Sequence, residues 1–323
     1  MLRSRFSAAA FAVATLLLPA AQAAAEYPER PIRVIVPFAP GGSSDATARL
    51  LSGALSDALK QPIVIENRGG AGGSIGIAQA AKAAPDGYTL LITSNAYVVN
   101  PLLDKQQLYD PIKDFAYITE INASPNILVA NQKAGISTFA DLLKRAKTDG
   151  APLFFSTAGV GTTSHLAGEL IKLRTGIPLQ HVAYSGAGPA TMAVLANDVP
   201  LELSSLSVVL AQVTSGALIG LLQTGEQPWP GLENVPTVGD AKVQDATSDV
   251  FQAFFAPAGT PQAIVDRLER ETLRILAQPD MKEKMLKAGF IITAHGAAGL
   301  MKRVAADTAR YKEVIDKAHI SIR

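Results

Sequence analysis

Short hydrophobic runs alternate with longer amphipathic stretches along the chain from Tyr27 onward. The short runs are often closed by Gly, Pro, Ser or Asn, which predicts strands bounded by turns. The longer stretches repeat apolar residues every three or four positions, which predicts helices with one buried face. Such alternation is typical of βαβ units around a parallel sheet, so we expect an α/β fold. The predicted strands are 32–37, 63–66, 89–93, 127–130, 153–156, 180–183, 201–204, 218–223 and 251–256, and the predicted helices are 44–59, 75–84, 138–147, 164–175, 189–196, 261–277, 280–288 and 298–318.

The first residues predict export. Arg3 and Arg5 precede an apolar run, residues 6–20, that is too short to span a bilayer comfortably. Small residues at alternate positions then offer signal-peptidase sites that end at Ala23 and Ala25. We therefore expect a cleaved signal peptide and export to an oxidising compartment. The alternative, an uncleaved signal anchor, would need a longer apolar stretch.

The length of the remaining chain predicts two domains. About 300 residues exceed what one hydrophobic core usually organises. Residues 224–250 are rich in Gly, Pro and acidic residues, which predicts a loop-rich return between the domains. No repeat of fixed period occurs, so a solenoid or propeller is not expected.

Charge and composition exclude several classes of function. The chain has 29 Lys and Arg against 28 Asp and Glu, a net charge of +1, and loss of Arg3 and Arg5 leaves 27 against 28, or −1. Nucleic acid is therefore not an expected partner. The absence of cysteine rules out disulfides and thiolate chemistry. Four histidines show no metal-ligand spacing, so neither a metal nor a cofactor is expected: His165, His181, His295 and His319.

A glycine-rich loop follows the first predicted strand. Residues 37–45 open a long helix, which places free backbone N–H groups and a positive dipole end at the carboxyl edge of the strand. Glycines let a ligand approach the backbone, Ser43 and Ser44 offer hydroxyls, and Asp45 can cap the helix. This arrangement suits an anion. An ordinary strand-to-helix turn is the alternative.

A second loop, residues 156–165, repeats this design. It holds Gly159, Gly161 and a cluster of hydroxyls before a helix that begins near Ser164. If each loop lies in its own domain, the two helix N-termini can face each other across a cleft and hold a carboxylate without an arginine. His165, in the first turn of the helix, is either a ligand contact or a structural partner of a nearby carbonyl.

Two further strand ends are candidate contact sites. Residues 181–189 include Tyr184, which could line a cleft, and residues 93–97 include Asn95, which could orient a carboxyl group or form a turn. The sequence gives no convincing enzyme or nucleotide-binding motif. Residues 72–76 match the G-x-S-x-G nucleophile elbow, but a glycine-rich loop rather than a strand precedes them. Neither G-x-G-x-x-G nor a P-loop occurs.

The chain as a whole resembles the tripartite tricarboxylate transporter receptors, also called Bug proteins. The resemblance runs through nearly all of the chain after the signal peptide, with the blocks in family order. The blocks are 37–45 with Ala48 and Arg49, 64–73, 86–90, 100–103, 156–165, Tyr184 and Gly186 with Pro189 and Ala190, 197–198, 234–237 and 255–261.

The resemblance implies a periplasmic location and a type II periplasmic binding-protein fold, with two α/β domains joined by crossing strands around a ligand cleft. Family members mostly bind small organic carboxylates through backbone amides and bridging waters. The implied division is a signal peptide at 1–25, one domain at 26–123 with 251–323, and a second domain at 124–250. The implied ligand contacts are Phe38, Pro40, Gly41, Gly42, Ser43, Asp45, Ser94, Asn95, Ser156, Thr157, Gly161, Thr162, Thr163, His165, Tyr184, Gly186, Ser204 and Ser205.

The chain departs from many relatives at two charged positions. Ser185 stands where a Lys is common, and Ser204 and Ser205 stand in the segment where an Asp is common. Our hypothesis is that the ligand carries carboxylates and no ammonium group, because a buried ammonium without a partner would be costly.

Together these features predict a monomeric solute-binding receptor that delivers a small organic carboxylate to the integral membrane subunits of a transporter. Ligand contacts from both domains would favour the closed state. An enzyme is the rival class, with His165 and its neighbouring hydroxyls as its acid and base, and a sensor subunit is another alternative. Hydroxyls and amides recognise carboxylates generically, so the sequence does not identify the acid.

Overall fold

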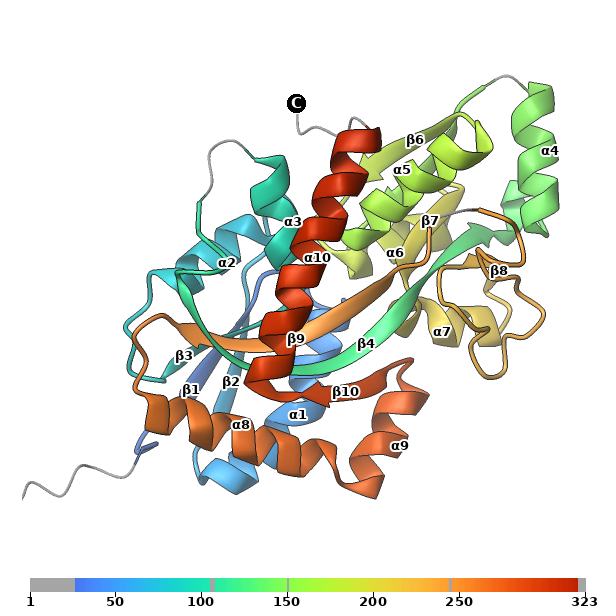
Figure 1. Ribbon diagram of the computed structural model, residues 1–323. Coiled ribbons are helices and arrows are strands. Elements are labelled where there is room, and N and C mark those ends of the chain that lie inside the picture. The colour runs from blue at the N-terminus through green and yellow to red at the C-terminus, as the bar shows by residue number, and fades with distance from the viewer. Residues whose placement is uncertain (1–26, 105–107, 150, 244–245, 319–323) are drawn as a thin grey trace, which may run out of the picture.

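A computed structural model describes residues 27–104, 108–149, 151–243 and 246–318. The predicted signal peptide and His319 lie outside these residues. One continuous ten-stranded sheet runs through two halves of the molecule, with helices on its faces (Figure 1). Among the described residues, no helix combines the length and apolarity needed to cross a membrane.

The first half is built on three parallel strands. In sheet order they are β2 (Ile63–Asn67), β1 (Ile32–Val36) and β3 (Thr89–Ser94). Its helical segments are α1 (Ser43–Leu59), a 3-10 turn at Ala71–Gly73, α2 (Ser74–Ala81), α3 (Ala96–Leu103), α8 (Gln262–Leu276) and α9 (Pro279–Lys287). Apolar side chains of α1 and α8 cover one face of this sheet, and those of α2 and α3 cover the other.

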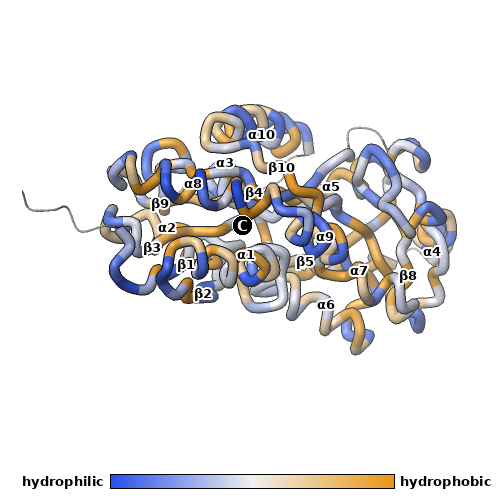
Figure 2. The backbone as a smooth tube through the Cα atoms, turned by 90° about the horizontal axis from the view of Figure 1, so that it is seen from below, coloured by the Kyte–Doolittle hydropathy of each residue, from blue (hydrophilic) through white to orange (hydrophobic). Residues whose placement is uncertain are grey.

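The second half repeats this plan. Its strands are β5 (Leu153–Thr157), β6 (Leu179–Ala183), β7 (Leu201–Ser205) and β8 (Leu218–Gln223). Its helical segments are a 3-10 turn at Gln132–Ala134, α4 (Phe139–Asp149), α5 (Thr163–Thr175), α6 (Ala187–Ala196) and α7 (Leu206–Thr214). Helices α4 and α5 pack on one face of the sheet, while α6 and α7 pack on the other. In Figure 2 hydrophobic segments follow the middle of the molecule, where the strands run.

Two long antiparallel strands cross between the halves. Residues 115–125 of β4 (Phe115–Asn131) pair with β9 (Asp249–Pro257), and residues 126–131 pair with β7 and β8. Strand β10 (Ile291–His295) pairs with β4 beside the crossing. The predicted α/β fold with crossing strands is thus confirmed, while the residue boundaries proposed for the domains stay a prediction.

Helix α10 (Gly296–Ala318) packs against both halves. Its Tyr311 and Ile315 share a hydrophobic cluster with Val99 and Leu103 of α3 and with Leu166 of α5. In Figure 1 this long red helix runs across the front of the molecule from β10 toward α5. The C-terminal helix therefore bridges the halves in addition to the crossing strands.

Every predicted strand and helix has a counterpart in the structure, which also contains elements that were not predicted. The elements that were not predicted are α3, α7, β10 and the first part of β4, of which only 127–130 was predicted. The missed part of β4 carries polar residues that are fully buried, namely Glu120 and Asn122, so its hydrophobic pattern is interrupted. Helix α3 contains Pro101, a residue that ordinarily indicates a break.

Candidate functional site

A small cavity lies between the two halves, beside the crossing strands. It encloses about 30 Å³, about the space of two water molecules. Its walls come from the loops after β1 and β5, the ends of β3 and β7, the start of α6 and the start of β9. The lining residues are Phe38, Gly42, Ser43, Ser44, Ser94, Ala158, Thr162, Thr163, Ser164, Ala187, Ser205 and Val250.

Three helices begin at this cavity. Helices α1, α5 and α6 start after Gly42, Thr162 and Gly186 respectively. The first backbone N–H groups of a helix have no partner within it, and the helix dipole is positive at that end. Every lining residue that the structure describes is uncharged. The cavity therefore offers hydrogen-bond donors and a positive potential, which suits a carboxylate.

Asp45 holds the first loop in place. Its carboxylate accepts hydrogen bonds from Gly41 N (3.0 Å), Asn67 Nδ2 (3.0 Å) and Arg49 Nε (2.9 Å). Burial alone would raise the pKa of this carboxyl, but these bonds outweigh it and lower the pKa. Asp45 is thus ionised, and its carboxylate is hydrogen-bonded to Gly41, Asn67 and Arg49. It does not line the cavity.

The second loop is held by its own hydroxyls and by His165. Thr162 caps α5 by accepting from His165 N (3.3 Å), and its hydroxyl donates to Gly159 O (2.7 Å). His165 Nδ1 accepts from Gly161 N (3.4 Å). The imidazole therefore shapes the loop, as in the structural alternative, although its partner is an amide rather than a carbonyl.

The ring of His165 stacks on His181, with ring centroids 4.2 Å apart. Burial lowers the pKa of His165. Burial and the neighbouring His165 lower the pKa of His181 to about 3. Both rings are neutral at neutral pH. His181 Nε2 lies 2.7 Å from Thr157 Oγ1, and this hydroxyl oxygen accepts a hydrogen bond from Gly159 N.

The predicted contacts divide into two groups. Those that line the cavity are Phe38, Gly42, Ser43, Ser94, Thr162, Thr163 and Ser205. The others are not among its lining residues: Pro40, Gly41, Asp45, Asn95, Ser156, Thr157, Gly161, His165, Tyr184, Gly186 and Ser204.

Several residues of the second group use their side chains in hydrogen bonds to neighbouring elements. Asn95 donates to Asp249 O (2.9 Å) and to Tyr311 Oη (2.8 Å), and Ser156 donates to Leu201 O (3.3 Å). These bonds tie the ends of β3 and β5 to adjacent elements. Their side chains support the walls of the cavity.

Glu202 places a buried carboxyl next to α6. It accepts from Thr191 Oγ1 (2.9 Å) and is fully inaccessible to solvent. Burial raises its pKa to about 7. Its Oε2 and the hydroxyl of Ser204 are buried without hydrogen-bond partners among the described residues. Neither residue lines the cavity.

Two side-chain amides that the sequence pattern did not indicate contact the site. Gln252 on β9 bonds to Ser43 and Ser44, and Asn126 on β4 bonds to Ser164. Both amides are fully buried in the crossing strands. A single polar residue in a strand does not indicate a site by its sequence position. Gln252 and Asn126 reach the loops because the crossing strands pass next to them.

The halves touch beside the cavity. Ala39 N donates to Ser185 O across the gap (3.3 Å). A Cβ built on Gly188 would lie only 2.5 Å from Pro40 O. Pockets for small organic ligands usually measure about 300 Å³ or more, so the halves have to separate to admit one.

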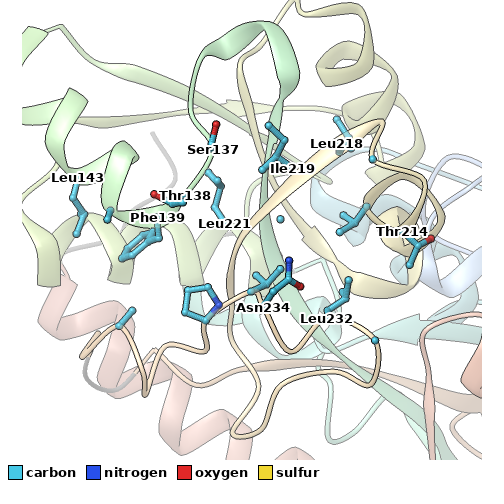
Figure 3. Close-up of a pocket in the computed structure, with 18 residues that line it drawn as sticks. Ser137, Thr138, Phe139, Leu143, Thr214, Leu218, Ile219, Leu221, Leu232 and Asn234 are labelled. Atoms are coloured by element: carbon cyan, nitrogen blue, oxygen red, sulfur yellow. The ribbon is translucent and has the colours of Figure 1, made fainter.

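A larger pocket of about 780 Å³ lies wholly in the second half (Figure 3). It is framed by the start of α4, by β8 and by residues 231–241, with apolar side chains such as Phe139, Ile219 and Leu232. Of its hydroxyls, that of Thr138 accepts from Asp141 N (3.0 Å) as a helix cap. Of these two pockets, the smaller one combines several helix N-termini with hydroxyls from both halves.

Comparison with known proteins places the chain in a family. Residues 47–320 match the tripartite tricarboxylate transporter family receptor. Protein BugT of Bordetella pertussis (strain Tohama I) is 33% identical over 279 residues, which are 86% of this chain and 86% of BugT.

Solved structures agree with this match. The periplasmic binding protein BugD has a TM-score of 0.88 and 30% identity, covering 92% of this chain and 100% of BugD. The R. palustris protein Rpa4515, solved with adipate, also has a TM-score of 0.88 and 30% identity, covering 92% of this chain and 99% of Rpa4515. The predicted binding-protein fold and the resemblance are both confirmed, and the chain belongs to the tripartite tricarboxylate transporter receptor family of periplasmic solute-binding proteins.

Proposed function

We propose that this protein captures a small organic carboxylate between its two halves in the periplasm and delivers it to the integral membrane subunits of a tripartite tricarboxylate transporter. The observation that carries the proposal is the meeting of three helix N-termini at one uncharged, hydroxyl-lined cavity. The adipate in the structure of Rpa4515 supports the ligand class.

Closure of the two halves provides the mechanism of capture. Ser43 and Ser44 come from the first half, and Thr162, Thr163 and Ser164 come from the second. A carboxylate that bonds to both sets is bound more tightly in the closed state than in the open one, so it shifts the equilibrium toward closure. The membrane subunits would then recognise the closed, loaded form. This binding requires no chemical change in the ligand.

The lining favours acids without an ammonium group. No described lining residue is an Asp or Glu. The nearby Asp45 carboxylate already accepts hydrogen bonds from Gly41, Asn67 and Arg49. An ammonium enclosed here would lose its hydration without gaining a counter-charge. Amino acids should therefore bind more weakly than the matching acids that lack the amino group.

A thermal-shift screen followed by calorimetry tests the proposal. The panel pairs straight-chain dicarboxylates from malonate to suberate, hydroxy acids and aromatic acids with their amides and α-amino analogues. We expect at least one acid to raise the melting temperature by mass action, and its amide and amino analogues to have little effect. A protein that responds to none of the acids, or better to the amino analogues, contradicts the proposal.

A further inference from the structure

Each crossing strand places one buried amide beneath one of the two serine-bearing helix starts. Gln252 lies on β9 and Asn126 lies on β4, and both are fully inaccessible to solvent. They contact Ser44 and Ser164, each of which is the second residue of its helix, α1 or α5. The same pairing of a strand amide with a helix-start serine thus occurs in both halves.

Gln252 sets the direction of the two hydroxyls in the first half. Ser44 Oγ donates to Gln252 Oε1 (2.6 Å), and Gln252 Nε2 donates to Ser43 Oγ (3.0 Å). A hydroxyl has a single hydrogen, and Ser43 uses a lone pair rather than that hydrogen in its bond to Gln252. The hydrogen of Ser43, which lines the cavity, therefore stays free for an acceptor inside it.

Asn126 has the corresponding place in the second half. Its Oδ1 accepts from Ser164 Oγ (2.8 Å), and its Nδ2 donates to Ser248 Oγ (3.2 Å). The backbone of Asn126 is itself fixed, because its N–H donates to Thr224 Oγ1 (2.9 Å) and its carbonyl accepts from Thr224 N (2.9 Å). Asn126 thus anchors the first turn of α5 to a strand that is rigidly held.

We propose that Gln252 and Asn126 are positioning residues for ligand recognition, one in each half. They hold the first turns of α1 and α5 against the crossing strands, and Gln252 leaves the Ser43 hydroxyl as a donor to the ligand. This arrangement selects an acceptor group such as a carboxylate over a donor group such as an amine. The inference rests on the proposed function, because it assigns the two amides to the same ligand.

A pair of matched substitutions separates positioning from mere support of the fold. Gln252→Met keeps the size of the side chain and removes both hydrogen bonds. Gln223→Met is the control, since Gln223 is equally buried and donates to Leu232 O (3.1 Å) and Val235 O (2.9 Å) away from the cavity. Calorimetry with the best-binding acid of the panel measures affinity, and thermal melting measures stability.

We expect Gln252→Met to weaken the binding of that acid at least tenfold, while Gln223→Met lowers the melting temperature and leaves affinity within twofold. Gln252→Glu should weaken binding still more, because the new carboxylate accepts the Ser43 hydrogen and adds a negative charge. Affinity within twofold of wild type for either substitution at position 252 overturns the inference.

A second measurement needs no ligand, so it still decides the inference if the wild-type protein binds no acid and the proposed function fails. Hydrogen–deuterium exchange follows the amides of residues 43–46 and 163–166. Gln252→Met should speed exchange at least fivefold in the first segment only, and Asn126→Leu in the second only. Unchanged exchange in both segments, or equal acceleration in both by either substitution, contradicts separate positioning roles.

Discussion

The groups at the cavity that can bind an anion are hydroxyls and backbone amides, and the ionisable residues around it shape the loops. Asp45 fixes the first loop through Gly41, and His165 fixes the second through Gly161. A carboxylate and a neutral imidazole thus serve the same purpose in the two halves. The amides they hold in place belong to the backbone and lose little entropy when a ligand binds.

The stacked histidine pair makes a prediction about pH. The pKa of His181 is about 3 in the folded protein, against an ordinary value of 6.5. Between these values the unfolded chain binds a proton that the folded protein does not, so the contribution of His181 to the free energy of unfolding rises with pH. It is complete above about pH 6.5 and is lost as the pH falls toward 3.

Urea titrations at several pH values check this contribution. His181→Gln should flatten the rise in unfolding free energy between pH 3 and 6.5, by up to about 1.4 kcal/mol per pH unit. Glu202, whose pKa is raised to about 7, has the opposite slope between 4.5 and 7 and remains in both proteins. An identical pH dependence for wild type and variant would show that His181 is not held neutral.

At the scale of elements, α10 and the crossing strands form one connected unit. Arg303 of α10 bonds to Asp249 at the start of β9, donates to Asp307 (Nε to Oδ2, 3.1 Å) and lies near Glu120 of β4 (3.8 Å). Burial would lower the pKa of Arg303, but Asp249 and Asp307 outweigh it and raise the pKa. The guanidinium thus stays charged among the carboxylates.

Removing this charge should destabilise the protein. Arg303→Met leaves the fully buried Glu120 without its arginine, and we expect a loss of about 3 kcal/mol in the free energy of unfolding, measured in urea. Arg30→Met is the control. Its ion pair with Asp86 is largely exposed, with side chains 61% and 42% accessible, so it should cost less than about 1 kcal/mol. Equal losses for both variants would contradict the account.

The predictability of the elements depended on whether their polar residues had local partners. The predicted 44–59 and 164–175 helices follow glycine loops with readable signals, and both occur within one residue of the prediction. The polar residues of β4 find their partners far along the chain, as when Asn122 bonds to Thr47, so the pattern alone did not indicate a strand. The site followed the same rule: loops at strand ends were anticipated, while Gln252 was not.

At the scale of the whole molecule, the two halves approach each other closely around the cavity. Gly188 in α6 lies against Pro40 of the other half, and a side chain there would meet the carbonyl at 2.5 Å. Gly53 in α1 has nothing within 4 Å of such a side chain. Both glycines lie in helices, but only Gly188 lies where the halves meet.

Alanine at these two positions separates closure from stability. Gly188→Ala should weaken binding of the best acid at least tenfold, because the added methyl group meets the Pro40 carbonyl when the halves approach each other. Gly53→Ala should leave affinity unchanged and stabilise the protein by up to about 1 kcal/mol. Unchanged affinity in Gly188→Ala would mean that a close approach of α6 to the Pro40 loop is not needed for binding.

The most direct test of the central claim places a negative charge in each half in turn. Ser43→Asp and Thr163→Asp alter the first residues of α1 and α5, where a carboxylate favours the helix, so both variants should fold. Calorimetry with the best-binding acid should show at least a hundredfold loss of affinity in each variant, because at the proposed site both helix starts contact the same carboxylate ligand. If either variant binds that acid as tightly as the wild type, the ligand is not held between the two halves at this cavity.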